Sequence, residues 1–331
     1  MSQCGSIGAT SSSAHEIKDD PMPTLFLSHA SPTLLMTERE LGLSYGHRDS
    51  TEAAWYRDLP AQLGLVGERR PKAIVVMCAH YITRGSVRIL AQDRYPGLYY
   101  DFGGFPDRLY NVQYPAPGSV ALANDIKALL AAADIPSELD TSRTLDHGVY
   151  IPLMYMFPEA DIPVLEVSML ASFDPDTHLR MGRALRALRD RGVLLIGSGE
   201  STHPSFSLSA SNRPRLNLFL DALNAGLAAP SAVQSSETGA QSIETDAQRK
   251  REATVRNWHA LPEARVTHSS PDHVLPLALS VGASDAQDSA YVVGDYDMTP
   301  VFSLRSFAFA RKLKPHAQTR VLESVAVRTD E

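Results

Sequence analysis

Short apolar segments alternate with amphipathic helical patterns along most of the chain, and this alternation is the feature that most restricts the fold. The clearest apolar segments predict strands at Thr24–Ser28, Ala73–Met77, Ile162–Leu170 and Val193–Ile196. Strands that alternate with helices form a mostly parallel or mixed central sheet flanked by helices. We therefore predict an α/β fold, and a length of 331 residues is compatible with a single domain.

Weaker patterns complete this outline. They predict strands at Ser86–Ala91, Tyr291–Val293 and Val301–Phe309, and helices at Ser119–Ala133, His178–Arg191, Arg215–Leu227, Asp246–Leu261 and Asp272–Val281. The stretch at about 229–248 is rich in Ser, Thr, Gln and Ala and is expected to be a polar surface insertion. We place a flexible N-terminal tail at 1–22, one folded domain at 23–312 and a C-terminal tail at 313–331.

Charge and cysteine content exclude several classes of function. The formal net charge is -7, and no run of Lys or Arg occurs, so neither nucleic acid nor an anionic membrane is an expected partner. No segment approaches the roughly 18 consecutive apolar residues of a membrane span, and the first residues lack the apolar centre of a secretory signal. Cys4 and Cys78 are the two cysteines, too few for a disulfide framework or a thiolate zinc site. These features predict a cytoplasmic protein that acts on a small molecule.

Histidines follow several of the predicted strands. His29 ends the first strand, His80 follows the second, and His203 comes a short loop after the strand that starts at Val193. In open α/β sheets, ligands bind beyond the carboxyl ends of the strands. His147 in TLDHGVY and His273 in SSPDHVLPL could reach the same rim. Neutral imidazole is the commonest metal ligand and suits Fe(II) or Zn(II), so the sequence predicts a metal site at this rim.

Other catalytic motifs do not fit. In GSGES, Gly197 and Gly199 flank Ser198 directly, unlike a nucleophile elbow, and neither a P-loop nor an HExxH motif occurs. His268 could line the pocket, or it could lie at the surface or behind the ligands. The aromatic residues beside Asp101 could form a substrate wall or could pack within their own loop.

Several strings of the sequence together resemble one known family. They are LFLSHASP, PKAIVVMCAHYITRG, YDFGGFPDRLYNVQYPAPGS, LDHGVYIPLMYMFPEADIPVLEVSM, HLRMGRALRALRDRGVLLIGSG and SSPDHVLPL, in this order. In this pattern the chain is similar to the class III extradiol ring-cleavage dioxygenases, and within them to the 4,5-DOPA dioxygenase-like branch of the LigB superfamily. The similarity extends over roughly Pro23 to Phe309 and implies that the domain at 23–312 is catalytic.

The resemblance also implies a reaction and a set of site residues. The expected reaction opens the ring of a catechol-type aromatic substrate with O2, with Fe(II) required for activity and Zn(II) possible as a bound metal. The implied metal ligands are His29, His80, His203 and His273. His147 is implied to act in acid–base catalysis or hydrogen bonding, and His203 could be the base instead of a ligand.

Two positions depart from the family pattern. Pro204 stands where asparagine usually follows the third histidine, and Glu200 stands where an apolar or neutral residue is expected. Both lie close to the expected metal. A zinc-dependent hydrolase and a catalytically inactive metal-binding homologue are therefore the alternative functions. For His273, we expect Asp272 or a neighbour to cap a helix over Val274–Val281 and to aim the imidazole at the rim.

Overall fold

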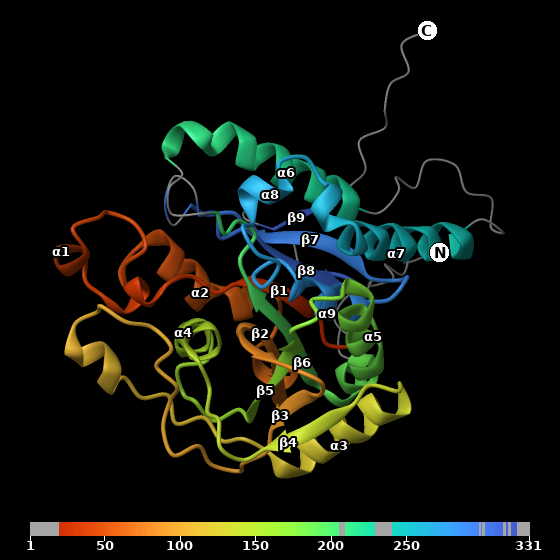
Figure 1. Ribbon diagram of the computed structural model, residues 1–331, viewed down its shortest axis with the longest axis horizontal. Helices are drawn as coiled ribbons and strands as arrows, with labels where there is room; N and C mark the ends of the chain where they lie inside the picture. Colours follow the sequence, from red (N-terminus) through yellow and green to blue (C-terminus); the bar gives the residue numbers. More distant parts are fainter. Residues whose placement is uncertain are drawn as a thin grey trace, which may run out of the picture.

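A computed structural model describes residues 20–204, 209–228, 240–297, 299, 302–313, 316 and 319–322, with side chains omitted at 240–245. Its nine strands form one mixed sheet in the order β4-β3-β5-β2-β6-β1-β8-β7-β9 (Figure 1). The strands are β1 (Thr24–Ser28), β2 (Ala73–Thr83), β3 (Val87–Leu90), β4 (Ser137–Asp140), β5 (Val164–Leu170), β6 (Val193–Gly199), β7 (Ser289–Gly294), β8 (Ser306–Ala310) and β9 (Arg320–Val321). The central strands β5, β2, β6 and β1 are parallel, whereas β8 and β7 continue the sheet antiparallel. The predicted α/β fold is confirmed.

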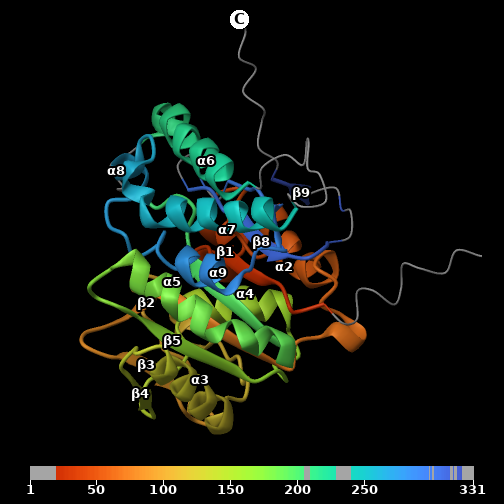
Figure 2. The same ribbon diagram turned by 90° about the vertical axis from the view of Figure 1, so that its right-hand side faces the viewer.

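Helices cover both faces of the sheet. They are α1 (Glu38–Leu41), α2 (Thr51–Gln62), α3 (Val120–Ala132), α4 (His147–Met156), α5 (Pro175–Leu185), α6 (Arg213–Leu227), α7 (Ala240–Arg256), α8 (Ala264–Thr267) and α9 (Leu277–Ala283). Figures 1 and 2 show α3, α5 and α9 on one face, with α2 and α4 on the other.

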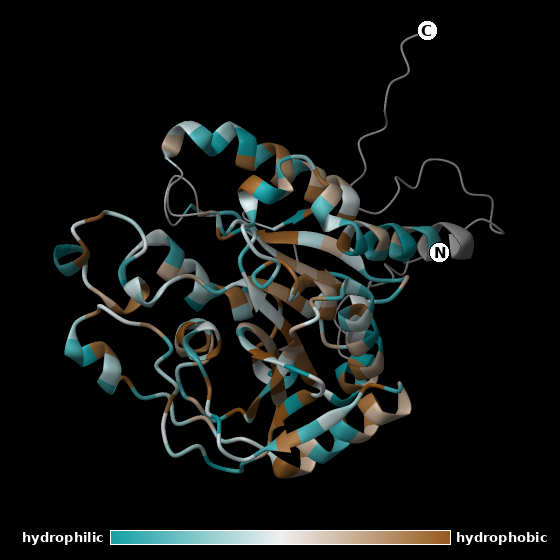
Figure 3. Ribbon diagram, viewed as in Figure 1, coloured by the Kyte–Doolittle hydropathy of each residue, from teal (hydrophilic) through white to brown (hydrophobic). Residues whose placement is uncertain are grey.

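The strand residues divide between two apolar cores because successive side chains of a strand point to opposite faces. In β1, Phe26 joins the core beneath α5 and α9, whereas Leu25 and Leu27 join the core beneath α2 and α4. The central strands are buried on both sides and are therefore almost continuously hydrophobic (Figure 3).

Two elements differ from their predicted form. The second strand does not end before His80; β2 continues to Thr83 with a register shift between Met77 and Ile82, so His80 lies at an irregular part of the strand. The predicted helix over Asp272–Val281 begins only at Leu277, and its cap position is Pro276, without a side-chain cap. The capping role proposed for Asp272 is therefore wrong, because its carboxylate contacts His273 instead.

The chain outside the central fold is only partly described. Residues 1–19 of the expected N-terminal tail and residues 229–239 of the expected insertion lie outside the described residues. The later part of that insertion belongs to α7. Within the expected C-terminal tail, the short strand β9 pairs with β7. Among the described residues, no helix is long and apolar enough to cross a membrane.

Candidate metal centre

The hydrogen bonds of His29 fix which of its ring nitrogens carries the proton. His29 follows β1 directly, and its Nδ1 lies 2.9 Å from Ser198 Oγ on the neighbouring strand β6. The Ser198 hydroxyl donates its single hydrogen to the Gly148 carbonyl at 2.6 Å, so Ser198 Oγ must accept from His29 Nδ1–H. The Nε2 atom of His29 therefore keeps its lone pair and can bind a metal.

His80 has the same arrangement, with a carboxylate as its partner. Its Nδ1 lies 3.2 Å from Asp101 Oδ2 and 4.0 Å from Asp146 Oδ1. Because a carboxylate accepts, the proton of the neutral ring belongs on Nδ1. The Cys78 thiol donates a hydrogen bond to the Asp146 carboxylate at 3.1 Å, so this second carboxylate already has a donor. His80 Nε2 is left with its lone pair directed away from these carboxylates.

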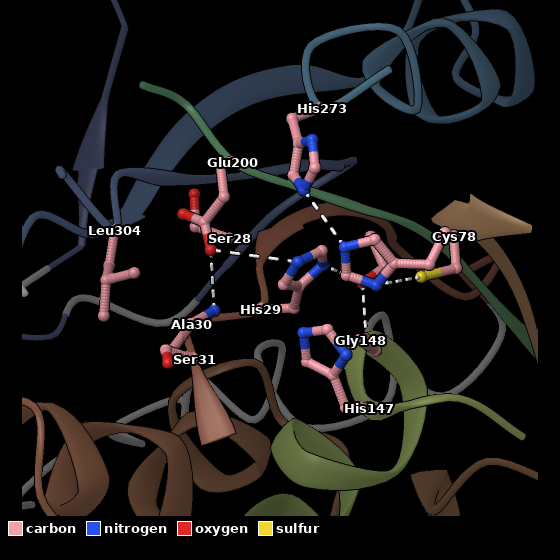
Figure 4. A network of polar contacts seen from close by, with 12 residues as sticks. Ser28, His29, Ala30, Ser31, Cys78, His147, Gly148, Glu200, His273 and Leu304 are labelled. Carbon is pink, nitrogen blue, oxygen red and sulfur yellow. Dashed lines mark hydrogen bonds and ion pairs between the residues drawn. The ribbon is translucent and has the colours of Figure 1, made fainter. Parts of the chain in front are cut away.

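His273 completes the cluster from a distant part of the chain. Its Nδ1 is 2.5 Å from Asp272 Oδ2, and its Nε2 is 3.1 Å from His80 Nε2. Two nitrogens that bind one ion at about 2.1 Å are separated by roughly 3.0 to 3.4 Å. Donor atoms of His29, His80 and His273 all lie within 4.8 Å of one another. Figure 4 labels His29 and His273 at this site. Each of the three imidazoles thus has a partner at Nδ1 and an Nε2 lone pair available for a shared cation, a common feature of protein metal sites.

The protein environment keeps the imidazoles of His29 and His80 neutral. Burial lowers the pKa of His29 well below its ordinary value, and the neighbouring histidines lower it further. Burial and the His147 ring beside it lower the pKa of His80 to about 3. Neutral imidazole is the form that binds metals, so the electrostatics of the cluster suit a cation at its centre.

His147 lies beside the cluster as the first residue of α4. The Oδ1 atom of Asp101 accepts from the His147 backbone N–H at 3.1 Å and lies 2.8 Å from its Nδ1. The His147 ring stacks on that of His80 with 4.3 Å between their centroids. Asp101 therefore connects one histidine of the cluster to the imidazole beside it. The sequence did not assign Asp101 this role, because the connection depends on a long loop that brings residue 101 to the start of α4.

His203 lies at the edge of the cluster. Its ring stacks on that of His273 at 3.8 Å between centroids and meets Phe302 edge to face. Burial lowers the pKa of His203 to about 4. His203 therefore joins the site from the side of His273, where its ring neighbours the ligand set without belonging to the group of mutually close donor atoms.

Glu200 is the least expected component of the site. Its Oε1 accepts from the Ala30 backbone N–H at 2.8 Å and lies 4.0 Å from His29 Nε2 (Figure 4). The side chain is buried, and its Oε2 has no hydrogen-bond partner among the described residues. Burial raises the pKa of this carboxyl well above its ordinary value.

His268 lies behind the site and not at its surface. It is buried, and its Nε2 is 3.2 Å from the Ser201 carbonyl. Its ring contacts the aromatic rings of Phe219 and Trp258. These contacts indicate a packing role for His268.

A pocket of about 410 Å³ opens beside the cluster. All five predicted site histidines line it: His29, His80, His147, His203 and His273. The rest of the lining comes from residues between 30 and 46, together with Glu200, Thr299 and Phe302. The aromatic residues around Asp101 do not line this pocket; Tyr100, Phe102 and Phe105 pack against the core beneath α2 and α4. Of the two roles considered for them, packing is the one that the structure shows.

Comparisons with known proteins identify a matching family and several similar proteins. Residues 23–287 match the family model of the catalytic LigB subunit of aromatic ring-opening dioxygenase. The chain is 33% identical to a 4,5-DOPA dioxygenase extradiol of Beta vulgaris, over 88% of this chain and 98% of that protein. It is 34% identical to a 4,5-DOPA dioxygenase extradiol of Escherichia coli K12, over 81% and 87% of the two chains. A crystal structure of an uncharacterized protein from Escherichia coli K12 superimposes with a TM-score of 0.59 at 27% identity, over 87% of this chain and 99% of that one.

Proposed function

The chain is a dioxygenase of the LigB family, in its 4,5-DOPA dioxygenase-like branch, and from this premise we propose that it opens the ring of a catechol-type substrate with O2. The proposal places a metal ion between His29, His80 and His273, with the substrate in the adjoining pocket. His147 and His203 are proposed to transfer protons.

The observation that carries this proposal is the set of partners at the Nδ1 atoms. Ser198, Asp101 and Asp272 each accept from one histidine and leave the opposite nitrogen, Nε2, unprotonated. Structural histidines seldom direct three lone pairs at one point, because the lone pairs repel one another unless a cation lies between them. The donor set suits both Fe(II) and Zn(II), since imidazole binds either metal.

When bound, Fe(II) supplies open coordination positions for the catechol and O2 and the redox chemistry that joins them. Three protein ligands suit this task because they leave several positions free. Zn(II) would keep the same ligands but lacks redox chemistry. We therefore propose Fe(II) as the active metal.

His147 is suited to accept a proton from the catechol. Its Nδ1 lies 2.8 Å from the Asp101 carboxylate, which accepts the Nδ1 hydrogen, so a neutral ring carries its lone pair on Nε2. The residue also lines the pocket. A positioned imidazole of this kind is a common general base. Asp101 holds the ring in place and stabilises the imidazolium that forms on proton uptake.

His203 is proposed as a second proton-transfer group. It lies against His273, and its lowered pKa keeps it neutral near pH 7 and able to accept a proton. The resemblance also allows His203 to be a fourth ligand. Metal content separates the two roles, since only a ligand is needed to retain the ion.

The test is O2 uptake with catechols after anaerobic reconstitution with Fe(II). We expect uptake that depends on both the catechol and iron, together with a yellow ring-opened product. The zinc-loaded protein should bind catechols and consume no O2. A zinc-loaded protein that hydrolyses esters, with no O2 uptake by the iron form, would instead support the zinc hydrolase.

A further inference from the structure

The pocket lining combines three kinds of side chain. The five site histidines are joined by the apolar side chains Pro32, Leu41, Leu43 and Phe302, which we call the apolar wall. Ser31, Thr33, Tyr45 and Thr299 supply hydroxyl groups. A catechol bound through its two oxygens at the histidines would have its ring substituent within this lining.

Positively charged side chains are absent from this lining. Of the 16 described residues that line the pocket, none is Lys or Arg. A substrate carboxylate is normally recognised by Arg or Lys, so the pocket lacks the group that would bind one.

The charges that surround the pocket are negative. Carboxylates of Asp101 and Asp272 lie at 3.2 and 2.5 Å from nitrogens of His80 and His273, respectively. The guanidinium near this group, Arg143, is bonded to Asp146 at 2.9 Å and lies over the rings of Tyr81 and Tyr99.

Two arginines form ion pairs with carboxylates that are close in the sequence to the lining residues Leu41 and Thr299. Arg108 binds Glu40 with its Nε at 2.9 Å, and Arg213 lies 2.6 Å from Asp297. A substituent carboxylate that entered the pocket would lose its water and meet no Lys or Arg among the described lining residues, which is unfavourable.

We propose that this pocket selects catechols whose ring substituent is uncharged and apolar, and that it discriminates against catechols that carry a carboxylate. The inference rests on the proposed function and adds the substrate class. An apolar substituent gains free energy from burial against Leu41, Leu43 and Phe302, at about 25 cal/mol per Å². The amino-acid substituent of DOPA, which includes a carboxylate, does not suit this wall.

The experiment compares four catechols that differ in their substituent: 4-ethylcatechol, 3,4-dihydroxyphenylacetamide, 3,4-dihydroxyphenylacetate and L-DOPA. The amide and the acetate have nearly the same shape and differ in charge. Two quantities are measured: kcat/KM with the Fe(II)-loaded enzyme, and the dissociation constant with the zinc-loaded protein by calorimetry. We expect 4-ethylcatechol to exceed the acetate by about tenfold or more in both, a difference of about 1.4 kcal/mol. The amide should fall between them.

Leu43→Lys tests whether the missing cation is the cause. Leu43 lines the pocket with 41% of its surface exposed, so a lysine can reach solvent there without disturbing the core. The variant should raise kcat/KM for the acetate relative to 4-ethylcatechol by about fivefold, the upper range for an exposed ion pair. Leu218→Lys is the matched control, because Leu218 is an exposed leucine on α6 outside the pocket lining.

The outcomes separate this inference from the proposed function. If the wild-type protein binds and converts the acetate as well as 4-ethylcatechol, the substrate class is wrong and the proposed function stands. If the Leu43→Lys and Leu218→Lys variants change the ratio equally, the assignment of selectivity to the apolar wall is wrong. If none of the four catechols binds the zinc-loaded protein or supports O2 uptake, the proposed function fails and this inference fails with it.

Discussion

At the scale of single residues, His29 and His147 lie next to each other but are expected to respond differently to substitution. Their ring centroids are 5.6 Å apart. His29 directs a free Nε2 toward the proposed metal, whereas His147 is connected to the cluster through Asp101. The two positions therefore separate metal binding from proton transfer.

We predict that His29→Gln leaves the fold intact and removes most of the bound metal, because an amide binds Fe(II) poorly. His147→Gln should retain the metal and slow turnover by about 10² to 10⁴-fold, the usual effect of losing an acid–base group. Iron content by elemental analysis and kcat from O2 uptake check both variants, with circular dichroism to confirm folding. A His29→Gln protein with normal iron content and full O2 uptake would contradict the proposed ligand set.

A second residue-scale prediction concerns Asp101, which positions two imidazoles with one carboxylate. Asp101→Asn keeps the size of the side chain and removes its charge. We expect metal affinity to fall by about 10- to 100-fold, as for other residues behind metal ligands. The pH dependence of kcat should also change, because the imidazolium of His147 loses its counter-ion.

Asp107→Asn provides the control, since Asp107 is an exposed carboxylate on the same loop. If the Asp101→Asn variant matches this control in metal affinity and in its pH profile, Asp101 has no positioning role.

At the scale of elements, two glycines near the end of β6 allow the segment around His273 to pack on the sheet. A Cβ atom at Gly199 would overlap the His273 carbonyl, and one at Gly197 would overlap the Pro276 carbonyl. The Glu200 N–H donates to the same His273 carbonyl at 2.9 Å. The position of the His273 backbone therefore depends on a residue without a side chain at 199.

We predict that Gly199→Ala shifts His273 and weakens metal binding, with a smaller effect on global folding than on metal affinity. The measurements are the zinc dissociation constant and the midpoint of urea unfolding. Gly97→Ala is the control, because a Cβ at Gly97 would meet no atom within 4 Å. Equal zinc affinity in the two variants would show that the β6 backbone does not position His273.

The elements also show what the sequence could and could not predict. The continuous apolar segment at Thr24–Ser28 predicted β1 with the bounds observed, and the histidine after it lies in the cluster. The helix α4 was not predicted, since its sequence HGVYIPLMYM is apolar on nearly every side and contains Pro152. The partners Asp101 and Ser198 were missed because hydrogen bonds between distant segments have no local sequence signal.

At the scale of the whole molecule, the packing of several imidazoles into one fold makes stability depend on pH. Besides His29, the histidines at 80, 203 and 268 have pKa values lowered to about 3, 4 and 3, chiefly by burial. Burial also lowers the pKa of His178, a buried histidine of α5 outside the pocket. In the unfolded chain these groups bind protons as the pH falls through about 6.5.

The direction of the effect follows from counting protons. Between about pH 6.5 and 4, the unfolded chain binds protons at these histidines and the metal-free folded protein does not, so the free energy of unfolding falls as the pH falls. Glu166 and Glu200 act in the opposite direction, because burial raises the pKa of each, and the folded state then holds protons that the unfolded state has lost. The five histidines outnumber these two carboxyls, so the net effect is destabilisation by acid.

We therefore predict that the metal-free protein loses at least about 2 kcal/mol of unfolding free energy between pH 6.5 and 5. This lower bound counts a single histidine whose effect is not cancelled by a carboxyl, at about 1.4 kcal/mol per pH unit. Urea unfolding at several pH values after treatment with a chelator measures this loss. The zinc-loaded protein should be more stable at pH 7 and should lose stability more steeply with acid, because protons compete with the metal for the ligand nitrogens. A metal-free protein that is equally stable at pH 6.5 and 5 would show that the buried imidazoles take up protons in the folded state. The proposal that the histidines of the centre are neutral and able to bind a metal would then be wrong.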